Sequence, residues 1–451
     1  MFSQAAKVWH TARVLSRVPL QRRIPHLSPA RLCRLQDVRV CRLVAYAAKH
    51  VPYYVELFRK HRLDSRSIRS AADLQSLPLL DKDVFRTNSP RFIAGCGVDN
   101  RLFKLRTSGS TGSPVEIYHD VRSLLMNLAN VEPEKAVLRQ VLSQASINRT
   151  KRQMSIAYPG SSARAIRQMY ANKLCIRPGR TEPFVSIDTP LDEVVRQINA
   201  YEPDVISSYG SYVEMLFRHV AANNIEFRQP EVVLYGADMM TPEGNDLIER
   251  QFGVTVLSRY GAVEAFHIGF TCPAKRGFHV RSDLNHIRIV DERGKDVPPD
   301  TPGEIVITNL VNRGSILINY RMGDVGVFSS ETCPCGRTLP LLKELLGRQE
   351  DILLLSGGRR VHPREVWAAL KSSPDIIRYQ LVQDTLHQFR LRLATPDQSS
   401  YARILKDPLL ALRQTLGNAE VVPEYCPEIV NVSGKFRPVV SNLHAAAQSA
   451  H

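Results

Sequence analysis

Hydrophobic and polar positions follow two different patterns along the chain. Residues 28–62 have a helical pattern, interrupted at Pro52, and therefore predict helices. From Phe103 onward, short apolar segments alternate with amphipathic stretches. Strands that alternate with helices predict an α/β domain whose strands are partly parallel.

Several segments give sharper expectations. Residues 241–253 predict a helix, with Thr241 as its N-cap, proline at the first helical position and glycine after its end. Asp81 is a candidate cap within residues 73–85. Residues 303–310 alternate with period two, which predicts a half-exposed antiparallel strand. Further strands are expected within 103–119, 190–209, 231–238 and 254–264.

The pattern changes again after Gly347, where short helical and strand-like segments predict a small α+β module. A chain of 451 residues is also too long for one comfortable core. We therefore expect a basic helical segment at 1–70 packed on a large domain at 71–346, followed by a small domain at 347–451.

Charge is concentrated at the N-terminus. The chain carries 60 Lys and Arg against 44 Asp and Glu, a net charge of +16, and residues 1–70 hold 15 of the basic residues but three acidic ones. The segment could be a helix pair docked on the protein's own body, a contact for a membrane surface or another anion, or an organelle-targeting presequence. No recognised nucleic-acid-binding module accompanies it, so nucleic acid is not an expected partner.

Composition narrows the class of protein. Hydrophobic content of 43% and charged content of 23% are ordinary for a globular chain. The uncharged apolar runs are too short for a membrane span, and no secretory signal is expected. Eight cysteines are too few for a disulfide scaffold, which favours a reducing, cytoplasmic location.

One candidate site is the segment "TSGSTGSP", from Thr107 to Pro114. Glycine lets the backbone approach a ligand, and exposed N–H groups with hydroxyls form a nest for anionic oxygens. The segment is not a usual P-loop, because no Gly-Lys-Ser/Thr closes it. Taken alone, it could equally be an ordinary loop.

Four further motifs follow in order. "YGAVE" (260–264) offers an aromatic face and a carboxylate that could hold Mg²⁺, and "YRMGDVG" (320–326) offers Asp324 to a ribose diol. "LGRQEDILLLSGGRRVHP" (346–363) lies at the expected domain boundary, and "VSGKFRP" (432–438) lies near the C-terminus. Each is weak by itself.

Together the five motifs resemble the adenylate-forming, or acyl-CoA ligase, superfamily, and most of all its phenylacetate–CoA-ligase branch with capsular-biosynthesis-type relatives. The resemblance covers roughly residues 40–440 and includes "HVPYYVELFRKHRLD" and "DLQSLPLLDKDVFR". It implies a large adenylate-forming N-terminal domain with a small mobile C-terminal lid. It also implies ATP, Mg²⁺ and CoA as the small molecules bound.

The resemblance assigns individual roles. Glu264 would bind Mg²⁺, Lys435 would be the catalytic lysine, and Asp351 would lie at the hinge between the domains. Val263 departs from the family pattern, because relatives usually have Thr or Ser there to donate to the α-phosphate. The residues implied to contact ATP or AMP are Thr107, Ser108, Gly109, Ser110, Thr111, Gly112, Gly236, Ala237, Tyr260, Gly261, Asp324 and Arg348.

The implied function is ATP-dependent activation of a carboxylic acid to an acyl-adenylate, followed by transfer to CoA. Alternatives are transfer to an amine, a sugar or a carrier protein, or a non-catalytic homologue, which Val263 would explain. The acid is not identified, and its pocket is expected near Tyr158, Tyr209, Gly236 and Ala262. The oligomeric state is also open, with a homodimer as one alternative.

A second candidate site combines Cys272 and His279 with Cys333 and Cys335. Four N/S ligands suit a closed, structural Zn²⁺ site, although the C-x-C pair could also be a redox pair or a coincidence. Similar stretches occur in zinc-carrying relatives of the same branch, which favours zinc. His267 is an alternative ligand or a substrate contact.

Overall fold

The computed structural model describes residues 3–95, 102–107, 114–148, 151–170, 175, 182–370, 376–417, 419–427, 429 and 436–443. The α-helices are α1 Gln4–Leu15, α2 Val18–Arg23, α3 Pro29–His50, α4 Pro52–Lys60, α5 Lys82–Thr87, α6 Val121–Asn130, α7 Glu132–Val141, α8 Gln144–Asn148, α9 Ser162–Met169, α10 Leu191–Tyr201, α11 Gly210–Ala222, α12 Pro242–Asp246, α13 Pro363–Leu370, α14 Gln398–Ile404 and α15 Lys406–Thr415. The strands are β1 Leu102–Arg106, β2 Glu116–Asp120, β3 Gln153–Ala157, β4 Phe184–Ser186, β5 Val205–Ser208, β6 Val232–Gly236, β7 Thr255–Ala262, β8 Phe266–Phe270, β9 Phe278–Val280, β10 Asn285–Val290, β11 Gly303–Asn309, β12 Tyr320–Phe328, β13 Leu341–Arg348, β14 Leu353–Leu354, β15 Arg360–Val361, β16 Arg378–Gln383, β17 Gln388–Ala394, β18 Glu420–Tyr425 and β19 Val439–Ser441.

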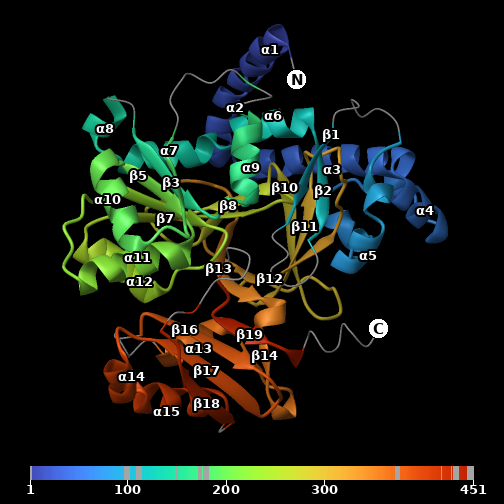
Figure 1. Ribbon diagram of the computed structural model, residues 1–451. Coiled ribbons are helices and arrows are strands. Elements are labelled where there is room, and N and C mark those ends of the chain that lie inside the picture. Colours follow the sequence, from blue (N-terminus) through green and yellow to red (C-terminus); the bar gives the residue numbers. More distant parts are fainter. Residues whose placement is uncertain are drawn as a thin grey trace.

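One large sheet dominates the structure (Figure 1). Its eleven strands run in the order β10-β11-β12-β13-β9-β8-β7-β6-β5-β3-β4. The strands β4, β3, β5, β6 and β7 pair in parallel, whereas the pairs from β7 through β8 to β10 are antiparallel. The predicted α/β class with a partly parallel sheet is therefore confirmed.

Helices cover both faces of the parallel half. On one face, Val194 of α10 packs in a core with Ile206 of β5. On the other face, Leu138 of α7 packs in a core with Leu257 of β7. Because both faces are buried, these strands are continuous apolar runs in the sequence rather than alternating ones.

The antiparallel half differs from expectation at β11. The sequence predicted a half-exposed antiparallel strand at 303–310. The strand and its antiparallel pairing are confirmed, but β11 is buried on both faces, so the predicted exposure is wrong. Its polar side chains are satisfied inside the protein, since Glu304 pairs with Arg321 and the Thr308 hydroxyl accepts a hydrogen bond from the Asn319 N–H. The alternating polar side chains of β11 therefore face buried polar partners and not solvent.

The predicted helix break at Pro52 and the Thr241 cap are confirmed, whereas the predicted Asp81 cap is confirmed only in its position. The helical region 28–62 is divided into α3 and α4 at Pro52, as its proline predicted. Thr241 caps α12 and its hydroxyl accepts from the Gly244 N–H at 2.9 Å. Asp81 occupies the N-cap position of α5, but its side chain makes no cap hydrogen bond.

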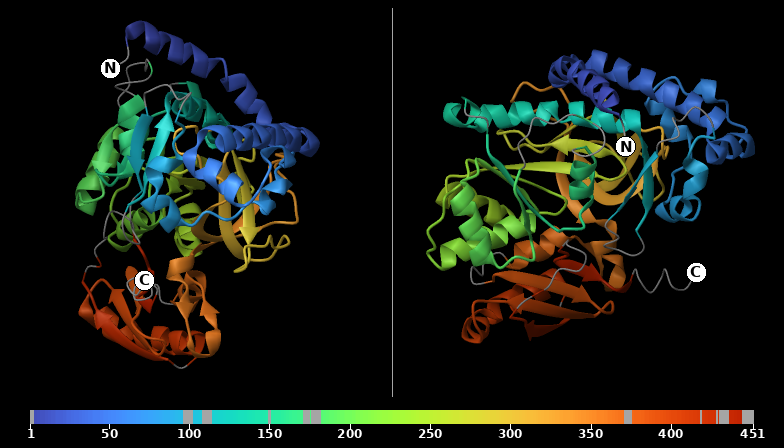
Figure 2. Two further views of the ribbon diagram at one scale, coloured as in Figure 1. Left: turned by 90° about the vertical axis from the view of Figure 1, so that its right-hand side faces the viewer. Right: turned by 45° about the horizontal axis from the view of Figure 1, so that its top comes forward.

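The C-terminal part of the chain forms a separate unit below the large sheet (Figures 1 and 2). Its four strands run in the order β18-β17-β16-β19 and pack with α13 and α15 around their own core, which includes Val366, Phe389 and Leu412. The last strand of the large sheet ends at Arg348, and this second core begins at Leu353.

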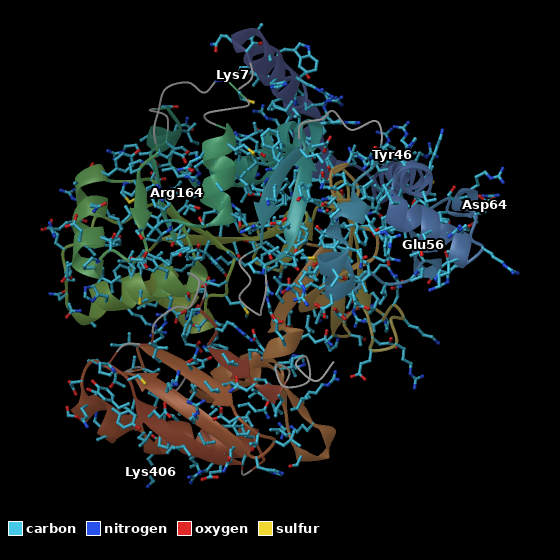
Figure 3. All side chains as sticks on the ribbon, turned by 45° about the vertical axis from the view of Figure 1, so that its right-hand side comes forward. Lys7, Tyr46, Glu56, Asp64, Arg164 and Lys406 are labelled. Atoms are coloured by element: carbon cyan, nitrogen blue, oxygen red, sulfur yellow. The ribbon has the colours of Figure 1, made fainter. Side chains whose placement is uncertain are left out.

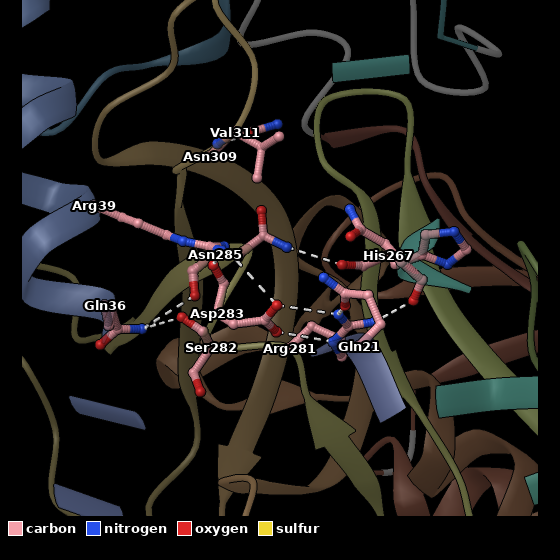
Figure 4. A network of polar contacts seen from close by, with 11 residues as sticks. Gln21, Gln36, Arg39, His267, Arg281, Ser282, Asp283, Asn285, Asn309 and Val311 are labelled. Atoms are coloured by element: carbon pink, nitrogen blue, oxygen red, sulfur yellow. Dashed lines mark hydrogen bonds and ion pairs between the residues drawn. The ribbon is translucent and has the colours of Figure 1, made fainter. Parts of the chain in front are cut away.

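The N-terminal helices are tied to the large sheet by a buried polar network (Figure 4). Arg281 and Asp283 are both fully buried, and Arg281 Nε donates to Asp283 Oδ1 at 2.9 Å. The same guanidinium donates to the side chain of Gln21 on α2 and to the carbonyl of Asn130 at the end of α6. Among the described helices, none combines the length and apolarity that a bilayer span requires.

Candidate active site

A cavity of about 2070 Å³ extends from the small unit to α7, which lies on the side of the sheet away from that unit (Figure 1). Side chains from both units line it, including Tyr260 on β7 and Arg437 just before β19. The residues predicted to contact nucleotide, metal or hinge that line this cavity are Thr107, Gly236, Ala237, Tyr260, Gly261, Glu264, Asp324, Arg348 and Asp351. The predictions at Ser108, Gly109, Ser110, Thr111, Gly112 and Lys435 lie outside the described residues.

Three of these side chains form one connected group. The Tyr260 hydroxyl donates to Asp324 Oδ2 at 2.7 Å, and Arg348 Nε lies 3.6 Å from Asp324 Oδ1. Asp324 and Arg348 are direct partners across β12 and β13. Burial raises the pKa of Tyr260, and the neighbouring Asp324 raises it further, so Tyr260 stays a neutral donor.

The cavity surface beside Tyr260 is formed by the small residues Gly261 and Ala237. A Cβ at Gly261 would lie 2.4 Å from the carbonyl oxygen of Phe266, so this position admits no side chain. Ala237 follows β6 with a φ of 71°, a left-handed conformation that favours glycine. This open backbone is suited to a flat ligand against the aromatic ring.

Glu264 and Val263 lie at the turn after β7. Burial raises the pKa of the Glu264 carboxyl, while Arg348 acts in the opposite direction. The Val263 carbonyl is held at 2.9 Å by Nε2 of His119, a fully buried histidine on β2. Burial lowers the pKa of His119 to about 3, so the neutral ring donates this hydrogen bond and fixes the turn. Sequence reasoning missed His119, for which no motif gave a signal.

Asp351 joins the two units. Its carboxylate accepts from the guanidinium of Arg437, with Nε 2.8 Å from Oδ1. Burial raises the pKa of Asp351 to about 6, although Arg437 lowers it in part. Arg437 lies two positions after Lys435 in the chain. The predicted hinge residue therefore contacts the segment that carries the predicted catalytic lysine.

The structure also brings together Cys272, His279, Cys333 and Cys335, whose ligand atoms all lie within 4.8 Å of one another. The Sγ atoms of Cys272 and Cys333 are 3.6 Å apart, and Cys335 Sγ lies 3.4 Å from His279 Nε2. Tetrahedral zinc with Zn–S bonds of about 2.3 Å requires ligand spacings close to these. The donor set and its geometry fit the ion, and His267 is not among the clustered residues.

A polar group at the α7 end of the cavity was not predicted as a unit. Glu134 on α7 lies 2.8 Å from Nδ1 of His267 and 3.1 Å from Nε of Arg259. All three line the cavity. They come from three separate segments, and only His267 stood out in the sequence, because it follows the motif at 260–264.

Comparison with known proteins agrees with this geometry. Residues 29–311 match the family described as AMP-binding enzyme. A phenylacetate-coenzyme A ligase from Thermus thermophilus is 26% identical over 80% of this chain and 81% of its own. Protein CapK from Staphylococcus aureus is 22% identical over 91% of this chain and 90% of its own.

A solved structure has the same fold. The 2-hydroxyisobutyryl-CoA ligase in its postadenylation state matches with a TM-score of 0.74 and 16% identity, covering 95% of this chain and 94% of that chain. The family match spans more than half of the chain and includes Tyr260, Gly261 and Glu264 of the cavity lining. This protein belongs to the AMP-binding enzyme family.

Proposed function

We propose that the protein activates a carboxylic acid with ATP and then transfers the acyl group to CoA. The observation that carries the proposal is the group formed by Tyr260, Asp324 and Arg348 in a cavity lined by both units. Tyr260 would stack on adenine, and Asp324 would accept hydrogen bonds from the ribose hydroxyls. The relatives named phenylacetate-coenzyme A ligase support the same chemistry.

In the first step, a carboxylate oxygen of the acid attacks the α-phosphorus of ATP, and pyrophosphate leaves. Two anions must approach, so cationic and donor groups have to offset their repulsion. Lys435 would supply one of these charges, since the next two residues, Phe436 and Arg437, line the cavity. Glu264 would hold Mg²⁺, which would neutralise phosphate charge when bound.

In the second step, the CoA thiolate attacks the acyl carbon and AMP leaves, with the thiol proton passing to solvent. A lysine on a separate unit suits both steps, because it can serve adenylation and then withdraw. Such a movement of the small unit would change the contact between Asp351 and Arg437.

The test is release of pyrophosphate over a panel of aryl, fatty and hydroxy acids, with hydroxamate formation measured with and without CoA. We expect acid-dependent pyrophosphate release that Lys435→Ala lowers by at least about a hundredfold, as for loss of a charged transition-state contact. Exposed Lys60→Ala is the matched control. Absence of release with every acid, or full release from Lys435→Ala, would contradict the proposal. Activation of an acid that yields no acyl-CoA when CoA is supplied would instead indicate another acceptor.

We also propose that Cys272, His279, Cys333 and Cys335 hold a structural Zn²⁺. The set offers four ligands and therefore no open position, so the ion would not take part in the reaction. It would join the loop after β8 to the loop between β12 and β13.

For the N-terminus we propose peripheral contact with an anionic membrane. The helix α1 lies at the edge of the molecule far from the small unit (Figures 1 and 2), and Lys7 on α1 and Lys406 mark the two ends in Figure 3. Trp9 and Leu15 are 58% and 62% exposed, beside Arg13. An exposed apolar face with basic residues is the pattern that binds acidic lipid surfaces.

Vesicle sedimentation tests this contact. We expect binding to vesicles that contain phosphatidylserine, weakened severalfold by Trp9→Ser and by salt, and no binding to neutral phosphatidylcholine vesicles. Val422→Ser, on an exposed hydrophobic position of the small unit, is the control and should bind like the wild type. Equal binding by both variants would contradict the proposal.

A further inference from the structure

The end of the cavity next to α7 holds a buried carboxylate that lies against two nitrogen groups and a buried amide oxygen that has no donor. Glu134 is 5% exposed, and neither carboxylate oxygen accepts a directed hydrogen bond from a described residue, although His267 and Arg259 lie nearby. Oδ1 of Asn127 on α6 is also buried and unpartnered. All these residues line the cavity.

These groups are placed by the helix geometry. Asn127 is on α6, Val131 joins α6 to α7, and Glu134 is on α7, so they recur at helical spacing and face the same cavity. Nδ1 of His267 lies toward Glu134, and no described residue partners its Nε2. Asn285 further fixes the strand, because its side-chain amide donates to the His267 carbonyl at 2.9 Å (Figure 4).

The charges nearby decide which donor fits. Glu134 carries a negative charge, because His267 and Arg259 together overcome the effect of burial and lower its pKa. Arg259 and Lys151 also line the cavity with positive charge, and Glu182, the acidic neighbour of Lys151, lines it as well. Glu134 is already paired with Arg259, so an ammonium group on the substrate would compete with a cation that is in place. A neutral O–H donor satisfies the oxygens without adding charge.

We infer that the acid activated by this protein carries a hydroxyl group, which donates to Glu134 at the far end of the acyl pocket. This inference rests on the proposed function and names the class of its substrate. An acid without the hydroxyl would leave the buried Asn127 oxygen without a donor, and Glu134 with His267 and Arg259 as its only neighbours among the described residues. Sites built to hydrogen-bond a hydroxyl discriminate strongly against analogues that lack it.

The experiment compares matched acids by kcat/KM for pyrophosphate release. The pairs are phenylacetate with its meta- and para-hydroxy derivatives, and hexanoate with ω-hydroxyhexanoate, with ω-aminohexanoate and adipate as charged arms. We expect at least one hydroxy acid to exceed its parent about tenfold or more. Glu134→Leu removes the acceptor and should bring that ratio to one or below, while Glu134→Gln keeps an amide oxygen and should lower the ratio only in part.

Glu132→Gln is the matched control. Glu132 lies on the same helix and is 4% exposed, but it pairs with Arg22 and Arg139 outside the cavity, so the hydroxyl preference should persist in this variant. If Glu134 variants do not fold, Asn127→Leu and the wild-type ratios still decide. Three results would overturn the inference alone: equal rates for hydroxy and parent acids, preference for a charged arm, or a ratio unchanged by Glu134→Leu. No release with any acid would overturn the proposed function as well.

Discussion

Val263 carries no polar atom at a position where its side chain lines the cavity beside Glu264. The carbonyl of Val263 itself accepts a hydrogen bond from His119, so the turn is fixed independently of the Val263 side chain. The side chain at position 263 can therefore be replaced without disturbing the fold.

We predict that Val263→Thr raises kcat/KM for ATP about tenfold, because a hydroxyl would donate to a charged phosphate oxygen, worth about 1.5–3 kcal/mol. Pyrophosphate release at varied ATP measures this. Val263→Ala removes volume without adding a donor and is the control. A Thr variant no faster than the Ala variant would show that the hydroxyl has no phosphate to reach.

Arg281 gives a prediction for stability. Replacing it with leucine leaves Asp283 buried without its main partner, which typically costs about 3–5 kcal/mol. We expect a clearly lower urea midpoint for Arg281→Leu, followed by circular dichroism. Exposed Arg293→Leu should leave the midpoint in place, and a result in which both variants unfold together would argue against the network.

At the scale of elements, two loops far apart in the sequence meet at the proposed zinc site. Cys272 and His279 flank the loop after β8, while Cys333 and Cys335 precede β13. Joining them by an ion fixes the connection between β9 and β13, which are paired strands.

We predict equimolar zinc in the purified protein by plasma mass spectrometry. Cys335→Ser should lose most of it and lower Tm by several degrees, since structural zinc contributes directly to folding. Cys426→Ser, at a cysteine outside the cluster, should keep both the zinc and the Tm. Protein free of metal, with the same Tm after chelation, would mean that the cysteines are only core residues.

Elements were predictable from the sequence where the signal is local. The Thr241 cap and the helix break at Pro52 follow from short-range rules, and the structure contains both. The burial of β11 was not predictable, because it depends on Arg321 from another strand. The grouping of Glu134 with His267 could not be predicted either, since only the packing of α7 on β7 and β8 brings them together.

At the scale of the whole molecule, the cavity depends on how the small unit is held. Asp351, in the connection between the two units, pairs with Arg437 of the small unit, and both line the cavity. Motifs in the sequence predicted the two units. The pairing of Asp351 with Arg437 could not be predicted, because it depends on the folded arrangement.

The raised pKa of Asp351, about 6 against a usual 3.8, predicts that this arrangement depends on pH. The state that buries Asp351 binds a proton more tightly than one that exposes it. It is therefore favoured as pH falls from about 6 towards 4, and it weakens as pH rises through 6.

X-ray scattering at about pH 5 and pH 8 measures how compact the two-unit arrangement is at each pH. We expect a larger radius of gyration at the higher pH. Asp351→Asn should make the radius insensitive to pH, whereas Asp384→Asn, paired with Arg390 on the small unit, should behave like the wild type. An equal radius at both pH values in the wild type would refute the prediction.

The buried guanidinium of Arg281 has a consequence for how the chain can be shortened. Arg281 donates hydrogen bonds to Gln21 and to Asp283. Two residues after Asp283, the side-chain amide of Asn285 donates to the carbonyl of His267. We therefore expect removal of the first helices to loosen His267, which lines the cavity where we propose that the acid binds. The shortened protein should become less selective among acids before it loses the ability to use ATP.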